Sequence, residues 1–139
     1  MARIVIAEDS AYDLFDRYGN IFGTHDIFVC CALMGEFDKF DGRWPDRPDG
    51  LELSLGVPNI GTIRQIQPDL VFADGLGGRG KDVLEAAATF FNTKERAYLW
   101  TTNGALNKWA ENQNYPIVTD SAHLVRIIDG TSPFSTTLP

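Results

Sequence analysis

The stretch that decides the fold runs from Pro68 to Asp82 and reads PDLVFADGLGGRGKD. Its apolar run, Leu70 to Ala73, is short and is bordered by proline and glycine, which is typical of a buried strand. The run stops at the carboxylate of Asp74, a glycine-rich loop follows, and a helical pattern starts near Asp82. We therefore predict a strand–loop–helix unit with an acid at the carboxyl end of its strand, where ligands bind in open α/β sheets.

A second strand of the same kind lies near the N-terminus, where the apolar run of residues 3–7 ends on Glu8 and Asp9. If the two strands are parallel neighbours, Glu8, Asp9 and Asp74 lie together at one edge of the sheet. Three carboxylates repel one another unless a cation lies among them, and hard oxygen ligands suit Mg²⁺. The pattern therefore predicts a weak Mg²⁺ site, although Asp9 or Ser10 is also needed to cap the helix that follows.

Composition places the chain among ordinary globular proteins. Its 139 residues fit one domain, with 44% hydrophobic and 22% charged residues. The net charge of -7 argues against direct binding to nucleic acid or to an anionic membrane. No apolar run reaches the roughly 18 residues of a membrane-spanning helix. Cys30 and Cys31 are adjacent and badly placed to form a bridge, which favours a reduced, cytoplasmic protein.

The rest of the chain alternates short apolar runs with helical patterns. Five strands and five helices in alternation predict an α/β fold, a three-layer sandwich around a five-stranded parallel sheet of order 2-1-3-4-5. Besides the two strands above, strands are expected at Ile27–Leu33, Ala97–Thr101 and Tyr115–Thr119. Helices are expected at Ser10–Phe22, Ile60–Ile66, from Asp82 onward, at Ala105–Glu111 and at Ser121–Asp129, with Gly130 just beyond the last.

The predicted domain covers residues 1–130 and is interrupted by an irregular segment at about 35–58 that is rich in proline and glycine. This insertion is either functional or a local decoration, and its alternating leucines, Leu51, Leu53 and Leu55, allow a short exposed strand. Residues 131–139 are expected to form a mobile tail.

Two segments carry a resemblance to a known family. IVIAEDS at 4–10 and QPDLVFAD at 67–74 resemble the two acidic strands of the receiver domain of two-component response regulators, the CheY-like family. The resemblance covers nearly the whole chain outside the 35–58 insertion and implies the flavodoxin/CheY-like fold. It also implies a stand-alone signalling protein whose output is a protein–protein contact. A sensor histidine kinase or a phosphotransfer protein would be one partner, and an unknown output protein the other, with no direct contact to nucleic acid or membrane.

The resemblance also implies roles for individual residues. Asp74 would be the phosphoacceptor, and its own phosphorylation and dephosphorylation would be the only reaction that the protein catalyses. A hydroxyl at the end of the fourth strand would bind the phosphoryl oxygens; this is Thr101 or Thr102, with Thr101 preferred from the strand length. The implied Mg²⁺ ligands are Glu8, Asp9, Asp74 and the backbone carbonyl of Leu76.

One departure from the family concerns its lysine at the end of the fifth strand. Thr119 and Asp120 stand there instead, with no Lys or Arg nearby. A phosphorylated aspartate gains about -2 charge, so the missing cation should weaken both phosphorylation and the response to it. An alternative is therefore a pseudo-receiver, an interaction module that keeps the fold but is not phosphorylated.

A third hypothesis comes from the glycine-rich loop. Residues 75–82 nearly fit the nucleotide-binding P-loop pattern, with a strand before and a helix after. The misfit is Asp82, which stands where a Ser or Thr should bind Mg²⁺. Lys81 either reaches into the site or is solvated on the loop, and the glycines alone are also explained by a tight turn.

Overall fold

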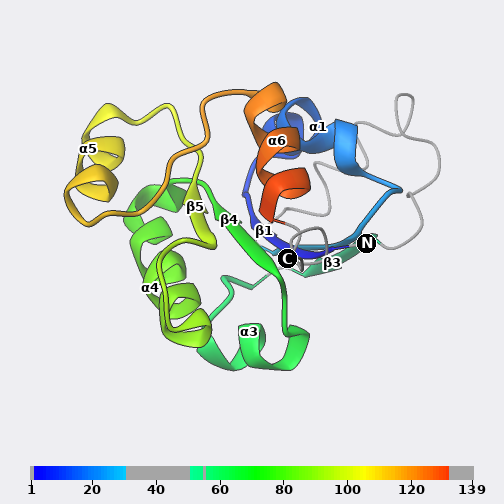
Figure 1. The fold of residues 1–139 in the computed structure, drawn as a ribbon, viewed down its shortest axis with the longest axis horizontal. Coiled ribbons are helices and arrows are strands. Elements are labelled where there is room, and N and C mark those ends of the chain that lie inside the picture. Colours follow the sequence, from blue (N-terminus) through cyan, green and yellow to red (C-terminus); the bar gives the residue numbers. More distant parts are fainter. Residues whose placement is uncertain (1, 31–50, 55, 132–139) are drawn as a thin grey trace.

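The computed structural model describes residues 2–30, 51–54 and 56–131 (Figure 1). Short strands and helices make up most of this part. In chain order the elements are β1 (Arg3–Ala7), α1 (Ala11–Tyr18), the 3₁₀ turn η1 (Gly19–Ile21), β2 (Asp26–Cys30), β3 (Leu51–Ser54), α3 (Ile60–Ile66), β4 (Leu70–Ala73), the 3₁₀ turn η2 (Leu76–Gly78), α4 (Gly80–Phe91), β5 (Ala97–Leu99), α5 (Gly104–Asn112) and α6 (Ser121–Thr131).

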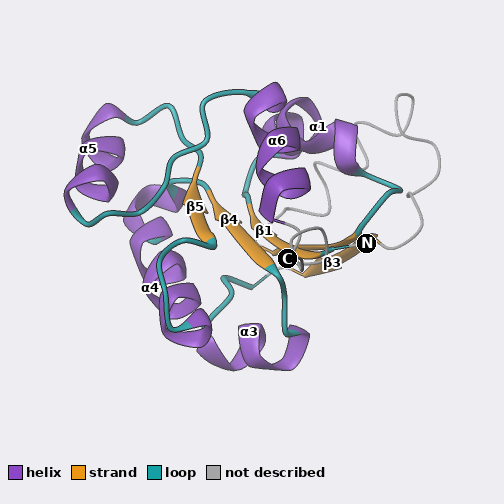
Figure 2. Ribbon diagram, in the orientation of Figure 1, coloured by secondary structure: helices purple, strands orange, loops and turns teal. Residues whose placement is uncertain are grey.

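The strands form one parallel sheet in the order β3-β2-β1-β4-β5 (Figure 2). The predicted α/β class is confirmed, and so is the predicted 2-1-3-4 order, which β2, β1, β4 and β5 realise. The central pair, β1 and β4, is buried on both faces, as the near-continuous apolar runs of parallel strands require.

The predicted fifth strand, Tyr115–Thr119, is wrong. Only one bridge forms there, between Ile117 and Leu99, supported by Leu99 N–H donating to the Pro116 carbonyl and Val118 N–H donating to the Leu99 carbonyl. Pro116 has no N–H to continue the ladder, and β5 itself is only three residues long. The fifth strand of the sheet is instead β3 at the opposite edge, inside the segment that was predicted to be irregular.

Helices cover both faces of the sheet. α1 and α6 lie on one face and α3 and α4 on the other, while α5 lies beyond β5 at the end of the sheet (Figure 1). Alternating residues of β1 serve the two layers: Ile4 and Ile6 pack in the cluster under α1 and α6, and Val5 and Ala7 in the cluster under α3 and α4. Burying each large aliphatic side chain contributes about 1.5–3 kcal/mol, so this double coverage fixes the two central strands.

Several helix boundaries differ from the prediction. α1 ends at Tyr18 and continues only as the turn η1, before Gly23 turns the chain with φ 85°. α4 begins at Gly80, two residues before the predicted start at Asp82. α6 runs through Gly130 to Thr131, so the predicted cap at Gly130 is wrong.

Some predictions fall on residues that the structure does not describe. These are the end of the strand predicted at 27–33, Cys31, most of the 35–58 insertion and the tail beyond residue 131. Within the described part of the chain, no helix has the length and apolar character needed to cross a membrane.

Candidate functional site

The register of β1 and β4 brings the acidic residues together. Ala7 pairs with Ala73, and Asp74 N–H donates to the Ala7 carbonyl at 2.9 Å, so the next residue of each strand lies at the carboxyl edge of the sheet. There, one carboxylate oxygen from each of Glu8, Asp9 and Asp74 lies within 4.8 Å of the others. The predicted clustering of the three acids is confirmed.

The three acids have different surroundings. Glu8 is 1% exposed, the side chain of Asp74 is 18% exposed, and Asp9 faces solvent. Ser10 caps α1, because its hydroxyl accepts a hydrogen bond from Asp13 N–H at 3.3 Å. Its own N–H donates to Glu8 Oε2 at 3.2 Å. The capping role considered for Asp9 thus belongs to Ser10, and Asp9 is left as the exposed acid of the cluster.

Arg17 also belongs to the cluster, although the sequence pattern did not indicate it. Its Nη1 donates to Glu8 Oε1 at 3.1 Å, to Asp74 Oδ1 at 3.2 Å and to the Trp100 carbonyl at 3.0 Å. The side chain is only 11% exposed, and its guanidinium carbon lies 5.6 Å from the centroid of the Trp100 ring. A positive charge is therefore built into the acidic cluster by the protein itself.

Helix periodicity explains the position of Arg17. Leu14 and Tyr18 are buried under α1, and Arg17 follows Leu14 by three residues on the same side of the helix. It therefore points toward the sheet rather than into solvent. The signal in the sequence was a basic residue beside the apolar stripe of the helix that directly follows the acidic strand.

One guanidinium faces two carboxylates, and the electrostatics reflect this shortage of positive charge. Burial and then the neighbouring Asp74 carboxylate raise the pKa of Glu8 to about 8, although Ser10 N–H and Arg17 act in the opposite direction. Burial tends to lower the pKa of Arg17, but Glu8 and the hydrogen bond to Asp74 outweigh it, so the pKa of Arg17 is raised. The ion pair with Arg17 thus offsets only part of the effect of burial on the pKa of Glu8.

The glycine-rich loop folds tightly around Asp74. Leu76, Gly77 and Gly78 all have positive φ, at 51°, 63° and 97°. Gly80 packs directly on the Asp74 carbonyl oxygen, where a Cβ atom would overlap that oxygen. The Gly75 carbonyl accepts hydrogen bonds from Gly78 N–H at 2.9 Å and Gly80 N–H at 3.0 Å. The glycines therefore serve a close turn that holds the backbone of Asp74.

The other predicted site residues lie around this turn. The Leu76 carbonyl accepts from Arg79 N–H at 3.2 Å and from Arg79 Nε at 3.3 Å, so in this conformation it is engaged within the loop. The Thr101 hydroxyl is half-buried beside Gly75, 3.3 Å from where a Cβ on that glycine would lie, and it accepts from Asn103 N–H. Thr102 is exposed. The strand predicted at Ala97–Thr101 ends at Leu99, so strand length no longer supports the choice of Thr101 over Thr102. Thr101 lies beside Gly75, the residue after Asp74, and its role remains a prediction.

Neither Lys nor Arg stands at Thr119 or Asp120, where the family resemblance implies a lysine. Thr119 is exposed, its N–H donates to His123 Nδ1 at 3.1 Å, and Asp120 Oδ1 accepts from His123 N–H at 2.7 Å at the start of α6. Lys81 does not replace it, because its Nζ lies 5.1 Å from the centroid of the Trp109 ring. The cation of the cluster comes from α1 alone among the residues described.

The donor set fits a hydrated divalent ion. All three ligand atoms are carboxylate oxygens, the type that Mg²⁺ prefers. Oxygens on opposite sides of a Mg²⁺ ion are about 4.2 Å apart, so the present spacing of up to 4.8 Å needs a small closure or a bridging water. Glu8 Oε1 and Asp74 Oδ1 already accept hydrogen bonds from Arg17, so an ion either shares these oxygens with the guanidinium or uses the second oxygen of each carboxylate.

Comparisons of the chain with protein-family models, with curated proteins and with solved structures gave no match. The case for a function therefore rests on the geometry of this site.

Proposed function

We propose that this protein is a receiver-like signalling module of the response-regulator type, in which Asp74 accepts a phosphoryl group from a phosphohistidine donor. The observation that carries this proposal is the convergence of Glu8, Asp9 and Asp74 at the carboxyl edge of β1 and β4. The same three residues are the phosphoacceptor and metal ligands that the sequence resemblance implies. The output is a contact with a partner protein.

The chemistry asks little of the protein beyond position and charge. A carboxylate oxygen of Asp74 attacks phosphorus, a P–O bond forms, and the P–N bond of the phosphohistidine breaks. The electron pair of that bond stays on the imidazole nitrogen of the donor. The close turn at Gly75 and Gly80 fixes the backbone of Asp74, while its side chain remains partly open to a donor.

Glu8, Asp9 and Asp74 would hold Mg²⁺, which would neutralise charge on the phosphoryl oxygens. The site needs this charge, because one arginine stands against three carboxylates. The positive charge of Arg17 beside Glu8 and Asp74 would keep the affinity for Mg²⁺ low. Thr101 is the hydroxyl that would bind a phosphoryl oxygen in the modified state.

A pseudo-receiver is the second candidate, and a specific observation favours it. Arg17 already occupies Asp74 Oδ1 in the unmodified protein, and the end of the predicted fifth strand carries Thr119 and Asp120 in place of a lysine. In that case the cluster is a structural ion-pair network and the partner contact does not depend on phosphorylation. A P-loop function has less support. A P-loop binds phosphate through backbone N–H groups and a lysine, but here the N–H groups of residues 78–80 donate to carbonyls within the loop and Lys81 lies over the Trp109 ring.

Intact mass after incubation with a small acyl phosphate and Mg²⁺ separates the two candidates. We expect the wild type to gain the mass of one phosphoryl group and Asp74→Asn to gain none. Asp82→Asn is the matched control, because Asp82 is an exposed acid just beyond the same loop. It should be modified like the wild type. An unmodified wild type under conditions that leave the protein folded would refute phosphorylation and favour the pseudo-receiver.

A further inference from the structure

We propose that Arg17 is the cation that holds the phosphorylated form of Asp74, supplied by α1 in place of the lysine that the family carries on its fifth strand. Arg17 is then a positioning residue for the phosphoryl group. This inference rests on the proposed function, and it names the residue that makes the modified state stable.

The first support is contact. Asp74 has a single cationic partner in the part of the chain that the structure describes, and this is Arg17 at 3.2 Å. A phosphoryl group on Asp74 extends the negative charge from an oxygen that is already next to the guanidinium. Arginine suits this role, because its planar fork of N–H donors matches the oxygens of a phosphoryl group.

The second support is that the guanidinium is held in place. Its side chain is 11% exposed and lies over the Trp100 ring, with the Trp100 carbonyl as a third acceptor for Nη1. Asp13 Oδ2 lies 4.0 Å from Nη2. An arginine on a solvated surface would lose side-chain entropy on binding a phosphoryl group, whereas this one is already ordered.

The third support is an exchangeable bond. Nη1 carries two hydrogens but has three acceptors: Glu8, Asp74 and the Trp100 carbonyl. The Trp100 carbonyl is a neutral acceptor, whereas a phosphoryl oxygen carries negative charge and attracts the guanidinium more strongly. A phosphoryl oxygen can therefore replace the carbonyl while the guanidinium moves little.

This exchange also links the site to the surface. The Arg17 carbonyl accepts a hydrogen bond from the Ser121 hydroxyl at the start of α6, at 3.3 Å. Trp100, which follows β5, loses its contact when the guanidinium turns to the phosphoryl group. Release of the Trp100 carbonyl passes the change at Asp74 to the chain after β5, where a partner can detect it.

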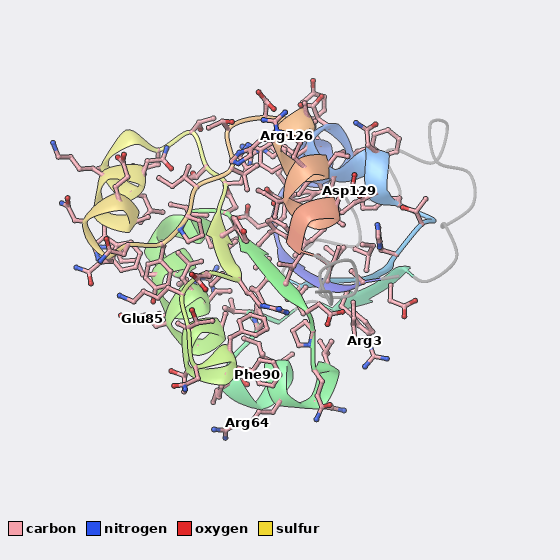
Figure 3. The ribbon with its side chains drawn as sticks, in the orientation of Figure 1. Arg3, Arg64, Glu85, Phe90, Arg126 and Asp129 are labelled. Carbon is pink, nitrogen blue, oxygen red and sulfur yellow. The ribbon has the colours of Figure 1, made fainter. Side chains whose placement is uncertain are left out.

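Beryllofluoride, a phosphoryl mimic, tests the inference without a kinase. Its binding in the presence of Mg²⁺ is measured by ¹⁹F NMR in wild type, Arg17→Gln, Arg17→Lys and Arg64→Gln. Arg64 is the matched control, since it lies on α3 and points away from the molecule (Figure 3). A charge-assisted hydrogen bond corresponds to roughly a tenfold to hundredfold change in affinity. We expect Arg17→Gln to bind weaker by that factor, Arg17→Lys to recover part of the loss, and Arg64→Gln to match the wild type.

Two other outcomes have distinct meanings. Binding by Arg17→Gln that equals or exceeds that of the wild type overturns the inference and leaves the receiver-like function standing, with Arg17 as a competitor of the bound cation. No bound ¹⁹F signal in any variant refutes the proposed function itself. Thermal melting of each variant without beryllofluoride identifies any that fails to fold, and Arg17→Lys, which keeps the charge, then carries the comparison with the wild type.

Discussion

Replacing Gly80 with alanine should destabilise the protein through a backbone clash. The added Cβ would overlap the Asp74 carbonyl oxygen and lie 3.1 Å from the Gly75 carbonyl oxygen and 3.2 Å from the Asp74 carbonyl carbon. All three atoms belong to the backbone, so no flexible side chain can yield. Either the start of α4 or the turn after β4 has to move.

The expected loss follows from two opposing effects. Forcing extra volume into a packed interior costs typically about 1–3 kcal/mol. Alanine regains about 0.5–1 kcal/mol, because glycine loses more conformational freedom in a helix. We therefore expect Gly80→Ala to lower the free energy of unfolding by about 1 kcal/mol and at most about 2.5 kcal/mol, which corresponds to a fall of a few degrees in Tm.

The structure supplies a matched control at Gly104. Both glycines are the first residue of their helix, but a Cβ on Gly104 would meet nothing within 4 Å. Gly104→Ala should leave the free energy of unfolding unchanged or raise it slightly. Urea denaturation followed by circular dichroism measures both variants. Equal unfolding free energies for Gly80→Ala and Gly104→Ala would show that the close approach to Asp74 does not constrain the loop.

Three further experiments address the charges of the site and its flank. The pKa of Glu8 is raised from 4.5 to about 8, so the folded protein keeps a proton that the unfolded chain releases, and stability falls as pH rises from about 4.5 to 8. By linkage, the loss of unfolding free energy over this pH range is roughly 5 kcal/mol at most. Urea denaturation at pH 5 and pH 8 should show a smaller loss for Glu8→Gln than for the wild type. An equal loss in both proteins would contradict a protonated Glu8. Mg²⁺ should raise the Tm of the wild type by mass action and raise that of Asp9→Ala less, so that equal shifts would argue against Asp9 as a ligand. Lys81→Ala should cost about 0.5–1 kcal/mol through its lost contact with Trp109 and leave the response of the Tm to Mg²⁺ unchanged, whereas a lost response would place Lys81 in the site.

The acidic edge could be predicted because its signals are local in the sequence. Each central strand is an apolar run that stops on an acid, and parallel neighbours bring such ends together. The failed strand at Tyr115–Thr119 had an equally apolar sequence. It does not form because Pro116 lacks an N–H and the neighbouring β5 is short, so only one bridge connects the two segments. Pairing is a property of two strands, and a pattern read along one of them does not contain it.

The turn after Asp74 shows a similar limit. The glycines between Gly75 and Gly80 were compatible with a P-loop, with a metal-binding carbonyl or with a plain tight turn. The sequence does not state which atoms approach which. Only the contact between Gly80 and the Asp74 carbonyl, together with the hydrogen bonds to the Gly75 carbonyl, favours the tight turn.

Arg17 and the missing lysine are best understood as one feature. A cluster of three carboxylates needs a positive charge close by, but that need does not specify which element supplies it. The family pattern would place this charge at Thr119, whose side chain carries none. The charge is in fact present on α1, at a distance of 3.1 Å from Glu8 and 3.2 Å from Asp74. Because α1 follows β1 directly, the strand that contributes two of the acids is linked by a short connection to the helix that contributes the cation. A site built in this way is partly neutral before any ligand arrives, so a ligand has to compete with Arg17 or recruit it. Measuring beryllofluoride binding with Arg17 changed distinguishes these two cases.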